Sequence, residues 1–264
     1  MYTHNLDPIL LDFWFLTIRW YSLAYIFGIF LGWWLGKRII KGLSKNVYPG
    51  FNSKEFDDLI TYLIISIVLG GRLGYIIFYN LEYYTAHPLD IIKVWEGGMS
   101  FHGALLGIIL STYIFSLKKN IPTFFLLDVI ACVSPIGIFL GRVANFINGE
   151  LIGKVTDVSW SVIFPKFDML TRHPSQLYEA LLEGLALFVI LNILILNKKY
   201  KLGTCSSVFL IFYGMFRIFA EQFREPDIQI GYLFYNLSMG TVLSGFMIVF
   251  GLIILIVLKR NEVK

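Results

Sequence analysis

The chain consists of long apolar runs separated by short polar connections. A bilayer core of about 30 Å needs roughly 20 mostly apolar residues for each spanning helix. Unpaired peptide groups in hydrocarbon are costly and the runs show no barrel-like alternation, so we expect helices rather than strands. The pattern predicts an all-α membrane protein with seven transmembrane helices, at about 18–36, 58–79, 99–117, 124–141, 177–196, 204–221 and 238–258.

The longest polar connection runs from about Asn145 to Ser175, between the fourth and fifth predicted helices. It is too long for a simple turn and mixes aromatic residues such as Trp160 with charges, so we expect a small outward-facing cap. A short hairpin is expected in VSWSVIF (158–164). Without internal repeats or an appended soluble domain, residues 1–264 are predicted to form a single membrane domain, with an insert at about 145–175.

The composition supports a membrane location. The 264 residues are 57% hydrophobic and 15% charged, with a mean hydropathy of +0.70, which is more apolar surface than one soluble core hides. The net charge of +4 comes largely from residues in short connections, so nucleic acid is not an expected partner. The N-terminal MYTHNLDPILLDF lacks the basic region and cleavage site of a secretory signal, and no removed leader is expected.

Basic residues are concentrated after alternate predicted helices, which predicts the orientation of the chain. Those after the first, third, fifth and seventh helices are Lys37, Arg38, Lys41, Lys45 and Lys54; Lys118 and Lys119; Lys198, Lys199 and Lys201; and Lys259, Arg260 and Lys264. Since cytoplasmic connections are enriched in Lys and Arg, the N-terminus is expected outside and the C-terminus in the cytoplasm.

The arginines are distributed differently from the lysines. Six of them lie in or beside the predicted outer halves of helices: Arg19, Arg72, Arg142, Arg172, Arg217 and Arg224. A lysine is sufficient as a topological charge, whereas the planar guanidinium binds carboxylate or phosphate at two points. This preference for arginine favours an anion-binding role on the outward side.

The segment GRVANFINGE (141–150) combines a cation and amides beside an apolar run. Arg142 and Asn145 are three positions apart, so on a helix they can converge on one ligand group. The alternative is a snorkelling arginine at a polar helix exit. A snorkelling arginine does not require Asn145, Asn148 and Glu150 beside it, and we therefore favour a binding site.

A second polar stripe lies in YGMFRIFAEQFREPD (213–227). Tyr213, Arg217, Glu221 and Arg224 are spaced 4, 4 and 3 residues apart, which places them on one face of a helix. An internal ion pair between Arg217 and Glu221 is the structural alternative. Both interpretations can hold, since Glu221 can orient Arg217 while a ligand contacts its other edge.

Three further residues stand out in apolar surroundings. His102, in WEGGMSFHGALLG (95–107), can exchange a proton near neutral pH, or it can be a hydrogen-bonded core residue. Arg72, flanked by glycines in mid-span, needs an internal partner or a water-filled cavity. Tyr21 lies near the outer interface, where a position in the aromatic belt is the simpler explanation.

Several other chemistries lack their motifs. The sequence contains no HExxH or Cys/His cluster, no GxSxG and no phosphate-binding loop, so no metal and no cofactor are expected. Cys132 and Cys205 lie in apolar sequence and are expected to be buried and inert. What remains is an arginine-rich pocket within the membrane, open to the outside, that suits an anionic lipid headgroup.

The chain resembles the bacterial prolipoprotein diacylglyceryl transferases over nearly its whole length. GRVANFINGELIG (141–153) fits that family's signature at every position. WEGGMSFHGALLG, GGRLGYIIFYN, RHPSQLYEALLEG and FRIFAEQFREPD are similar to its other blocks, in the same order.

The resemblance implies transfer of a diacylglyceryl group from phosphatidylglycerol to the lipobox cysteine of a prolipoprotein signal peptide, in the bacterial inner membrane. Glycerol 1-phosphate is released, and no cysteine of the enzyme is needed. By motif, Arg142 and Arg217 would hold the phosphate, Asn145 the headgroup, and Glu150 and Glu221 would orient them. Tyr21, Tyr213, Gly153, Arg72 and Arg224 would complete the substrate site.

The thiol has an ordinary pKa of about 8.5 and must lose its proton. His102 is the natural base, although a cationic pocket can also favour the thiolate without one. Two other functions remain open: a transporter of anionic lipids or organic anions, and an intramembrane protease. Repeat halves would favour a transporter and a pair of facing aspartates a protease, and the sequence has neither.

Overall fold

The computed structural model describes residues 2–14, 16–46, 53–197, 201–226 and 237–260. Six helical segments of this described part are long and apolar enough to cross a membrane: Trp20–Leu43, Lys54–Tyr79, Phe101–Lys119, Thr123–Asn148, Ser175–Ile195 and Met239–Arg260. The chain is therefore a mostly helical, multi-pass membrane protein, as the hydrophobic pattern predicted.

Each predicted apolar run is found in a helical segment. The single helices are α1 (Trp20–Asn46), α2 (Ser53–Tyr79), α4 (Phe101–Lys119), α5 (Thr123–Asn148), α8 (Thr204–Glu221) and α9 (Met239–Arg260). The fifth run is composite, with α6 (Ser175–Glu179), the π-helical turn η3 (Ala180–Ala186) and α7 (Leu187–Ile195). Helices α1 and α5 continue past the predicted ends at 36 and 141, because hydropathy detects only the apolar part of a helix.

The chain divides into two compact units, and each is described by itself. The first contains residues 1–36 and 130–264, and the second contains residues 37–129. Of the basic residues that predicted the orientation, Lys198, Lys199 and Lys264 lie outside the described residues.

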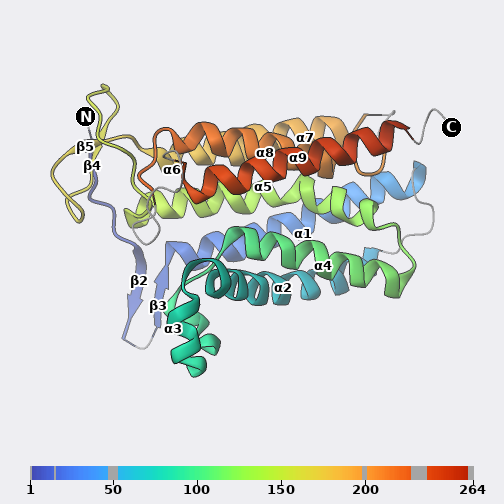
Figure 1. Ribbon diagram of the computed structural model, residues 1–264, viewed down its shortest axis with the longest axis horizontal. Coiled ribbons are helices and arrows are strands. Elements are labelled where there is room, and N and C mark those ends of the chain that lie inside the picture. The colour runs from blue at the N-terminus through green and yellow to red at the C-terminus, as the bar shows by residue number, and fades with distance from the viewer. Residues whose placement is uncertain (1, 15, 47–52, 198–200, 227–236, 261–264) are drawn as a thin grey trace. The chain divides into compact units, whose positions relative to one another are not determined.

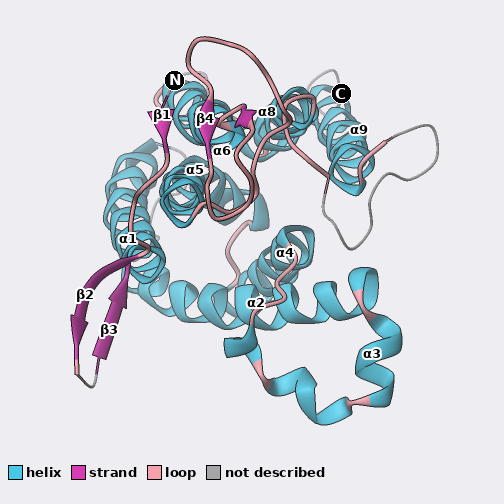
Figure 2. Cartoon of the chain, turned by 90° about the vertical axis from the view of Figure 1, so that its left-hand side faces the viewer, coloured by secondary structure: helices cyan, strands magenta, loops and turns pink. Residues whose placement is uncertain are grey.

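In the second unit, α2 and α4 pack through glycines. A Cβ added to Gly74 would lie 2.6 Å from the Cα of Gly103, so the two backbones are nearly in contact. Ser111 Oγ donates a hydrogen bond to Ser66 Oγ at 3.0 Å across the same pair of helices. Such close approach of small residues is the usual means of helix association in membranes. Along the chain, α2 and α4 are connected by α3 (Leu81–Ala86) and two short 3₁₀ turns, η1 (Pro88–Ile92) and η2 (Val94–Glu96) (Figure 2).

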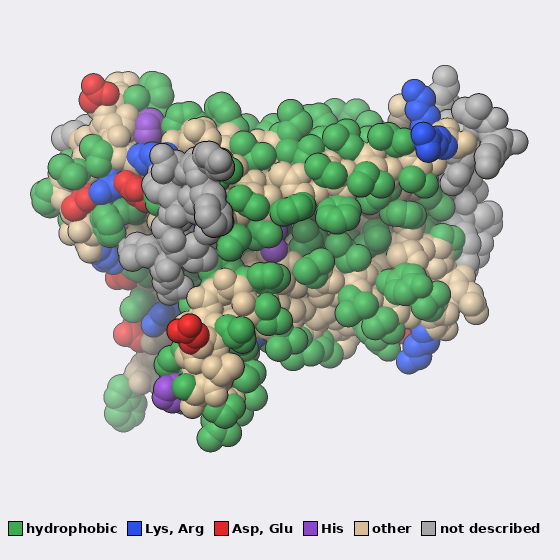
Figure 3. Space-filling model, in the orientation of Figure 1, with side chains coloured by type: hydrophobic (Ala, Val, Ile, Leu, Met, Phe, Trp, Pro, Cys, Tyr) green, Lys and Arg blue, Asp and Glu red, His purple; other side chains and the backbone are tan. Residues whose placement is uncertain are grey.

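In the first unit, α5, α7, α8 and α9 run side by side (Figure 1). Helices α8 and α9 also meet at a glycine, since a Cβ on Gly214 would lie 2.7 Å from the carbonyl oxygen of Ser244. Hydrophobic side chains cover the visible face of α9, and Lys259 and Arg260 end that helix (Figure 3). Cys132 and Cys205 are fully buried, as expected from their apolar sequence surroundings.

Short strands adjoin the helices of the first unit. β4 (Val162–Ile163), within VSWSVIF, pairs with β5 (Thr171–Arg172) and with β1 (Tyr2–Thr3). The buried His4 follows β1, and its Nε2 lies 2.8 Å from the carbonyl oxygen of Phe146, so the N-terminal segment is joined to the end of α5.

A second hairpin, formed by β2 (Ile9–Phe13) and β3 (Leu16–Arg19), precedes α1 directly. It was not predicted, because its sequence has none of the glycine or asparagine turn residues that indicate a hairpin.

Candidate functional site

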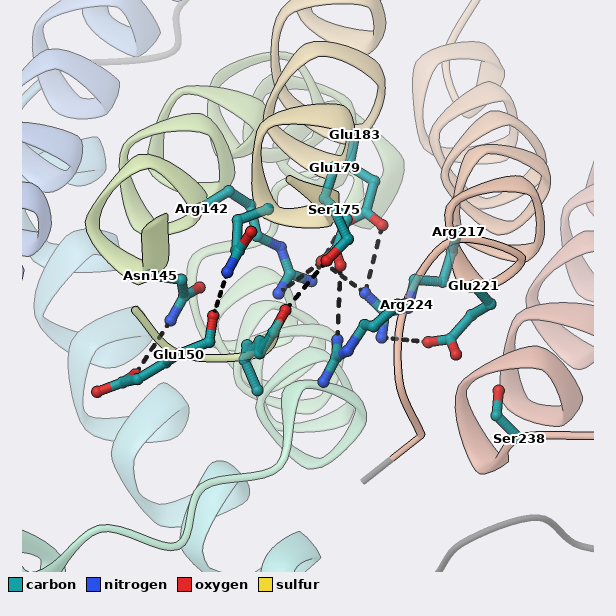
Figure 4. Close-up of polar contacts among 12 residues, drawn as sticks. Arg142, Asn145, Glu150, Ser175, Glu179, Glu183, Arg217, Glu221, Arg224 and Ser238 are labelled. Carbon is teal, nitrogen blue, oxygen red and sulfur yellow. Dashed lines mark hydrogen bonds and ion pairs between the residues drawn. The ribbon is translucent and has the colours of Figure 1, made fainter. Parts of the chain in front are cut away.

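Three arginines and three glutamates come together in the first unit, where α5, α6, η3 and α8 approach one another (Figure 4). We call these six residues the arginine–glutamate cluster: Arg142 on α5, Glu179 on α6, Glu183 on η3, Arg217 and Glu221 on α8, and Arg224 just after α8.

Glu179 lies at the centre of the cluster and contacts all three arginines. Its Oε2 is 2.8 Å from Nη1 of Arg142 and 2.8 Å from Nη1 of Arg217. Its Oε1 is 3.7 Å from Nη1 of Arg224. This one carboxylate therefore fixes the relative positions of three guanidinium groups that come from separate segments.

The other two glutamates complete the network. Glu183 Oε2 lies 3.2 Å from Nη2 of Arg142, and its Oε1 lies 3.5 Å from Nη1 of Arg217. Glu221 pairs with Nη2 of Arg217, the internal ion pair considered from the sequence. Gly240 of α9 packs against this pair, since a Cβ there would lie 2.6 Å from Oε1 of Glu221.

The cluster is buried and balanced in charge. Glu179 and Glu183 are fully buried, and Arg217, Glu221 and Arg224 nearly so. Three positive charges face three negative ones, and buried charges in proteins need such pairing. The side chain of Arg142 is 16% exposed, the largest value among the six, so Arg142 is the most accessible member of the cluster.

The π-helical turn η3 brings the two central glutamates to the cluster. Glu179 ends α6 and Glu183 lies inside η3, four residues later. Gly184 in this turn packs on α5, where a Cβ would lie 2.6 Å from the Cβ of Phe139. Single π-helical turns are rare and are frequently found at functional sites.

A second group of polar residues lies further along α5. Asn145 Nδ2 donates to the hydroxyl of Tyr21 at 3.0 Å and to Oε2 of Glu150 at 3.4 Å. Asn148 Nδ2 donates to Oε1 of Glu150 at 3.3 Å. Helix α5 continues to Asn148, beyond the predicted end at 141, so both Arg142 and Asn145 lie on it. They are three residues apart on one helix, as expected.

Two predicted site residues are held by local packing. Gly153 is enclosed by backbone, since a Cβ there would collide with the carbonyl oxygen of His173 and lie 2.8 Å from that of Phe223. Tyr213 is buried on α8, one turn before Arg217, and its ring stacks on Phe209 with centroids 5.6 Å apart.

The predicted helical stripe needs one correction. Tyr213, Arg217 and Glu221 share α8, but this helix ends at Glu221, so Arg224 is not on it. Pro226 follows closely, and a proline cannot donate the hydrogen bond that would continue a helix. Arg224 contacts Glu179 from the turn that follows α8. Its backbone pairs with that of Gly153 in an isolated antiparallel β-bridge.

Arg72 and His102 belong to the second unit. Arg72 is 4% exposed, and its guanidinium donates to backbone carbonyls: Nε to Ile91 at 3.0 Å, and Nη2 to Asp90 at 2.6 Å and Lys93 at 3.1 Å. The internal partners expected for this intramembrane arginine are thus carbonyl groups. His102 lies in the first turn of α4, which Ser100 caps by accepting from the Gly103 N–H at 3.2 Å.

Of the remaining arginines, Arg172 stabilises the connection between α5 and α6. It donates to Asp168 through Nη2 at 2.5 Å, to the carbonyl of Gly153 at 2.9 Å and to Glu225 at 3.1 Å. The hydrogen bonding between Arg172 and Asp168 holds the pKa of Asp168 below its usual value. Arg19 pairs with Ile9 in the β2–β3 hairpin and lies outside the cluster.

The two central glutamates, Glu179 and Glu183, were not predicted as site residues. RHPSQLYEALLEG was used only as a family block, although it places Glu179 and Glu183 four residues apart in or beside an apolar span. Carboxylates in a membrane helix are rare and usually functional. The two glutamates could have been predicted as site residues from this four-residue spacing.

Comparison with known proteins identifies the family of the chain. The family model described as prolipoprotein diacylglyceryl transferase matches residues 8–257. The phosphatidylglycerol–prolipoprotein diacylglyceryl transferase of Rickettsia akari (strain Hartford) is 50% identical over 249 residues, covering 94% of this chain and 95% of the relative. Its counterpart in Ehrlichia canis (strain Jake) is 51% identical over 240 residues, covering 89% and 90%. The chain belongs to the prolipoprotein diacylglyceryl transferase family.

Proposed function

We propose that the chain transfers the diacylglyceryl group of phosphatidylglycerol to the lipobox cysteine thiol of a prolipoprotein. The sulfur forms a thioether with the glyceryl CH₂ carbon, the bond from that carbon to the phosphate oxygen breaks, and glycerol 1-phosphate leaves. The thiol proton passes to a base. Family membership supports this reaction, and the observation that carries it is the buried pair of Arg142 and Arg217 on one carboxylate.

The arginines suit the charge that develops in this reaction. A phosphodiester with one negative charge becomes a monoester with more, so negative charge grows on the leaving phosphate in the transition state. We assign Arg142 and Arg217 to this phosphate, because preorganised donors in a dry site act strongly on such charge. Glu179, Glu183 and Glu221 orient the two guanidinium groups.

The remaining site residues receive supporting roles. Asn145, with Tyr21 and Glu150, is assigned to the glycerol headgroup, whose hydroxyls match amide and carboxylate partners. Gly153 and Tyr213 are assigned to the walls of the substrate site. Arg224 contributes a third positive charge and pairs with Glu179. Arg72 was predicted to bind substrate, but its backbone contacts favour a structural role.

We assign the thiol proton to His102, whose ordinary pKa near 6.5 suits proton transfer at neutral pH. The alternative is that the arginines alone favour the thiolate. Replacement of His102 by Gln distinguishes these two mechanisms of thiol deprotonation. If His102 is the base, the variant loses most of its lipidation rate, and if the arginines suffice, the rate is retained.

We further propose that the chain acts as one transferase domain in the bacterial inner membrane, with the N-terminus outside and the C-terminus in the cytoplasm. Helix α8 would be the seventh span, since its 18 residues extend about 27 Å. The connection between α5 and α6 would form the outward cap, and the site would open on that side.

The direct test is mass spectrometry of a lipobox peptide after incubation with purified protein and phosphatidylglycerol. The expected product carries one diacylglyceryl group on its cysteine. The Arg142→Ala protein should yield none at comparable protein levels. A lipid or anion transporter would give no adduct with either protein, which would contradict the proposal.

A further inference from the structure

In the second unit, the chain between α2 and α4 forms a separate non-spanning segment. It comprises α3, η1 and η2, and we refer to residues 81–96 as the connecting segment (Figure 2). Helices α2 and α4 are both long and apolar enough to span a membrane. The connecting segment therefore lies where these two spans leave the membrane on one side.

One edge of the connecting segment carries large exposed apolar side chains. Leu89, Ile92 and Trp95 are 78%, 70% and 74% exposed. Leu89 and Ile92 are three residues apart in η1, and a 3₁₀ helix has three residues per turn, so these two share one edge. Trp95 lies in the next turn, η2. Two charged groups beside them form an ion pair, since Lys93 Nζ lies 2.6 Å from Asp90 Oδ1.

The backbone of the connecting segment is held from α2. The guanidinium of Arg72 donates to the carbonyls of Asp90, Ile91, Lys93 and Gly97, and it lies over the ring of Tyr84 at 5.0 Å. Short 3₁₀ turns leave carbonyls without helical partners, and such groups are costly where water is scarce. By satisfying them, Arg72 makes this irregular backbone compatible with a poorly hydrated layer.

We propose that the connecting segment lies in the membrane interface, with Leu89, Ile92 and Trp95 immersed among the phospholipid headgroups and the upper acyl chains. Apolar and aromatic side chains beside a neutralised polar edge are typical of segments that lie in this layer, and tryptophan is enriched there. The occupant of the exposed edge is therefore lipid, and Arg72 fastens the segment to α2.

Fluorescence quenching tests this placement. Leu89→Cys is labelled with bimane in the full-length protein, reconstituted in phosphatidylcholine vesicles whose acyl chains are either ordinary or brominated near their glycerol end. The matched control is Thr85→Cys, at an exposed polar position of the same segment. Both native cysteines are fully buried, so the label reports on the new site. We expect about twofold stronger quenching by brominated lipid at position 89, and stronger quenching by aqueous iodide at position 85.

Tryptophan emission gives a measurement without a label. The difference in emission between the native protein and Trp95→Phe should be quenched by the brominated lipid. The proposal is overturned if the position 89 label and this difference are insensitive to bromine. Quenching of position 89 by iodide as strong as that of position 85 would indicate water, and insensitivity to both quenchers would indicate a protein cover. Either result contradicts the lipid contact.

Discussion

At the scale of single residues, Glu179 has the largest effect on the site, because one carboxylate neutralises and aligns three arginines. Glu179→Gln keeps the size of the side chain but removes its charge. Loss of one partner from a buried ion pair costs about 3–5 kcal/mol, and we expect the free energy of unfolding to fall by this order. We also expect kcat for peptide lipidation to fall about 100-fold, since the guanidinium groups lose their alignment.

The matched control for that experiment is Glu225→Gln. Glu225 also pairs with an arginine, but its side chain is 40% exposed. An exposed pair contributes up to about 1 kcal/mol, so this variant should remain close to the native protein in both measurements. A Glu179→Gln protein with native kcat would refute the positioning role.

Substitution of Arg142 by Lys tests whether the site needs only a positive charge or also the planar guanidinium. Its fork contacts Glu179 through Nη1 and Glu183 through Nη2, and a lysine ammonium cannot make both contacts in the same geometry. Arg142→Lys should therefore lose about 10²–10³ in lipidation rate despite its retained charge. Arg260→Lys, at the end of α9, is the same exchange away from the cluster and should leave the rate unchanged. Equal rates for the two variants would show that charge alone suffices.

At the scale of elements, the pairing of α2 with α4 depends on the absence of side chains. A Cβ on Gly74 would lie 2.6 Å from the backbone of Gly103, so Gly74→Ala should separate the helices. Overpacking of this kind costs about 1–3 kcal/mol, measurable as a lower thermal midpoint in detergent. Gly42→Ala in α1 is the control, because its Cβ meets nothing within 4 Å. There the higher helix propensity of alanine should raise stability by up to about 1 kcal/mol.

The connection between α5 and α6 should be sensitive to acid. Hydrogen bonds from Arg172 lower the pKa of Asp168 in the folded protein, so the unfolded chain binds its proton more readily. The resulting stabilisation is complete above the ordinary value of 3.8 and is lost as the pH falls through the lowered pKa. Hydrogen-exchange protection at Thr171 and Arg172 should fall in that range. Asp168→Asn should remove this pH dependence, and an unchanged profile would exclude Asp168 as its source.

At the scale of the whole molecule, the proposed orientation makes the two ends differ in access. A membrane-impermeant maleimide added to intact spheroplasts should label Asp7→Cys, in the exposed N-terminal segment, and should not label Arg260→Cys. Both native cysteines are buried, which keeps the background low. Labelling of Arg260→Cys alone would show that the orientation is opposite to the one proposed.

The sequence was sufficient to predict the helices and part of the site. Long apolar runs report directly on membrane spans, and the spacing of Arg217 and Glu221 was enough to place them together. The central role of Glu179 was missed because it arises from three segments that meet only in the folded chain. The carbonyl partners of Arg72 could not be predicted for a related reason, since backbone groups of another segment are not visible as a motif.

The equal numbers of arginines and glutamates in the cluster have a consequence for turnover. In the proposed reaction, a lipid phosphodiester enters with one negative charge, and glycerol 1-phosphate carries between one and two at neutral pH. A pocket with an excess of arginines would retain this product more tightly than the substrate and would be inhibited by it. Because Glu179, Glu183 and Glu221 balance the three guanidinium charges, the cluster has no excess positive charge with which to retain the product. We therefore expect Arg142 and Arg217 to stabilise the charge as it develops, and glycerol 1-phosphate then to leave readily into water.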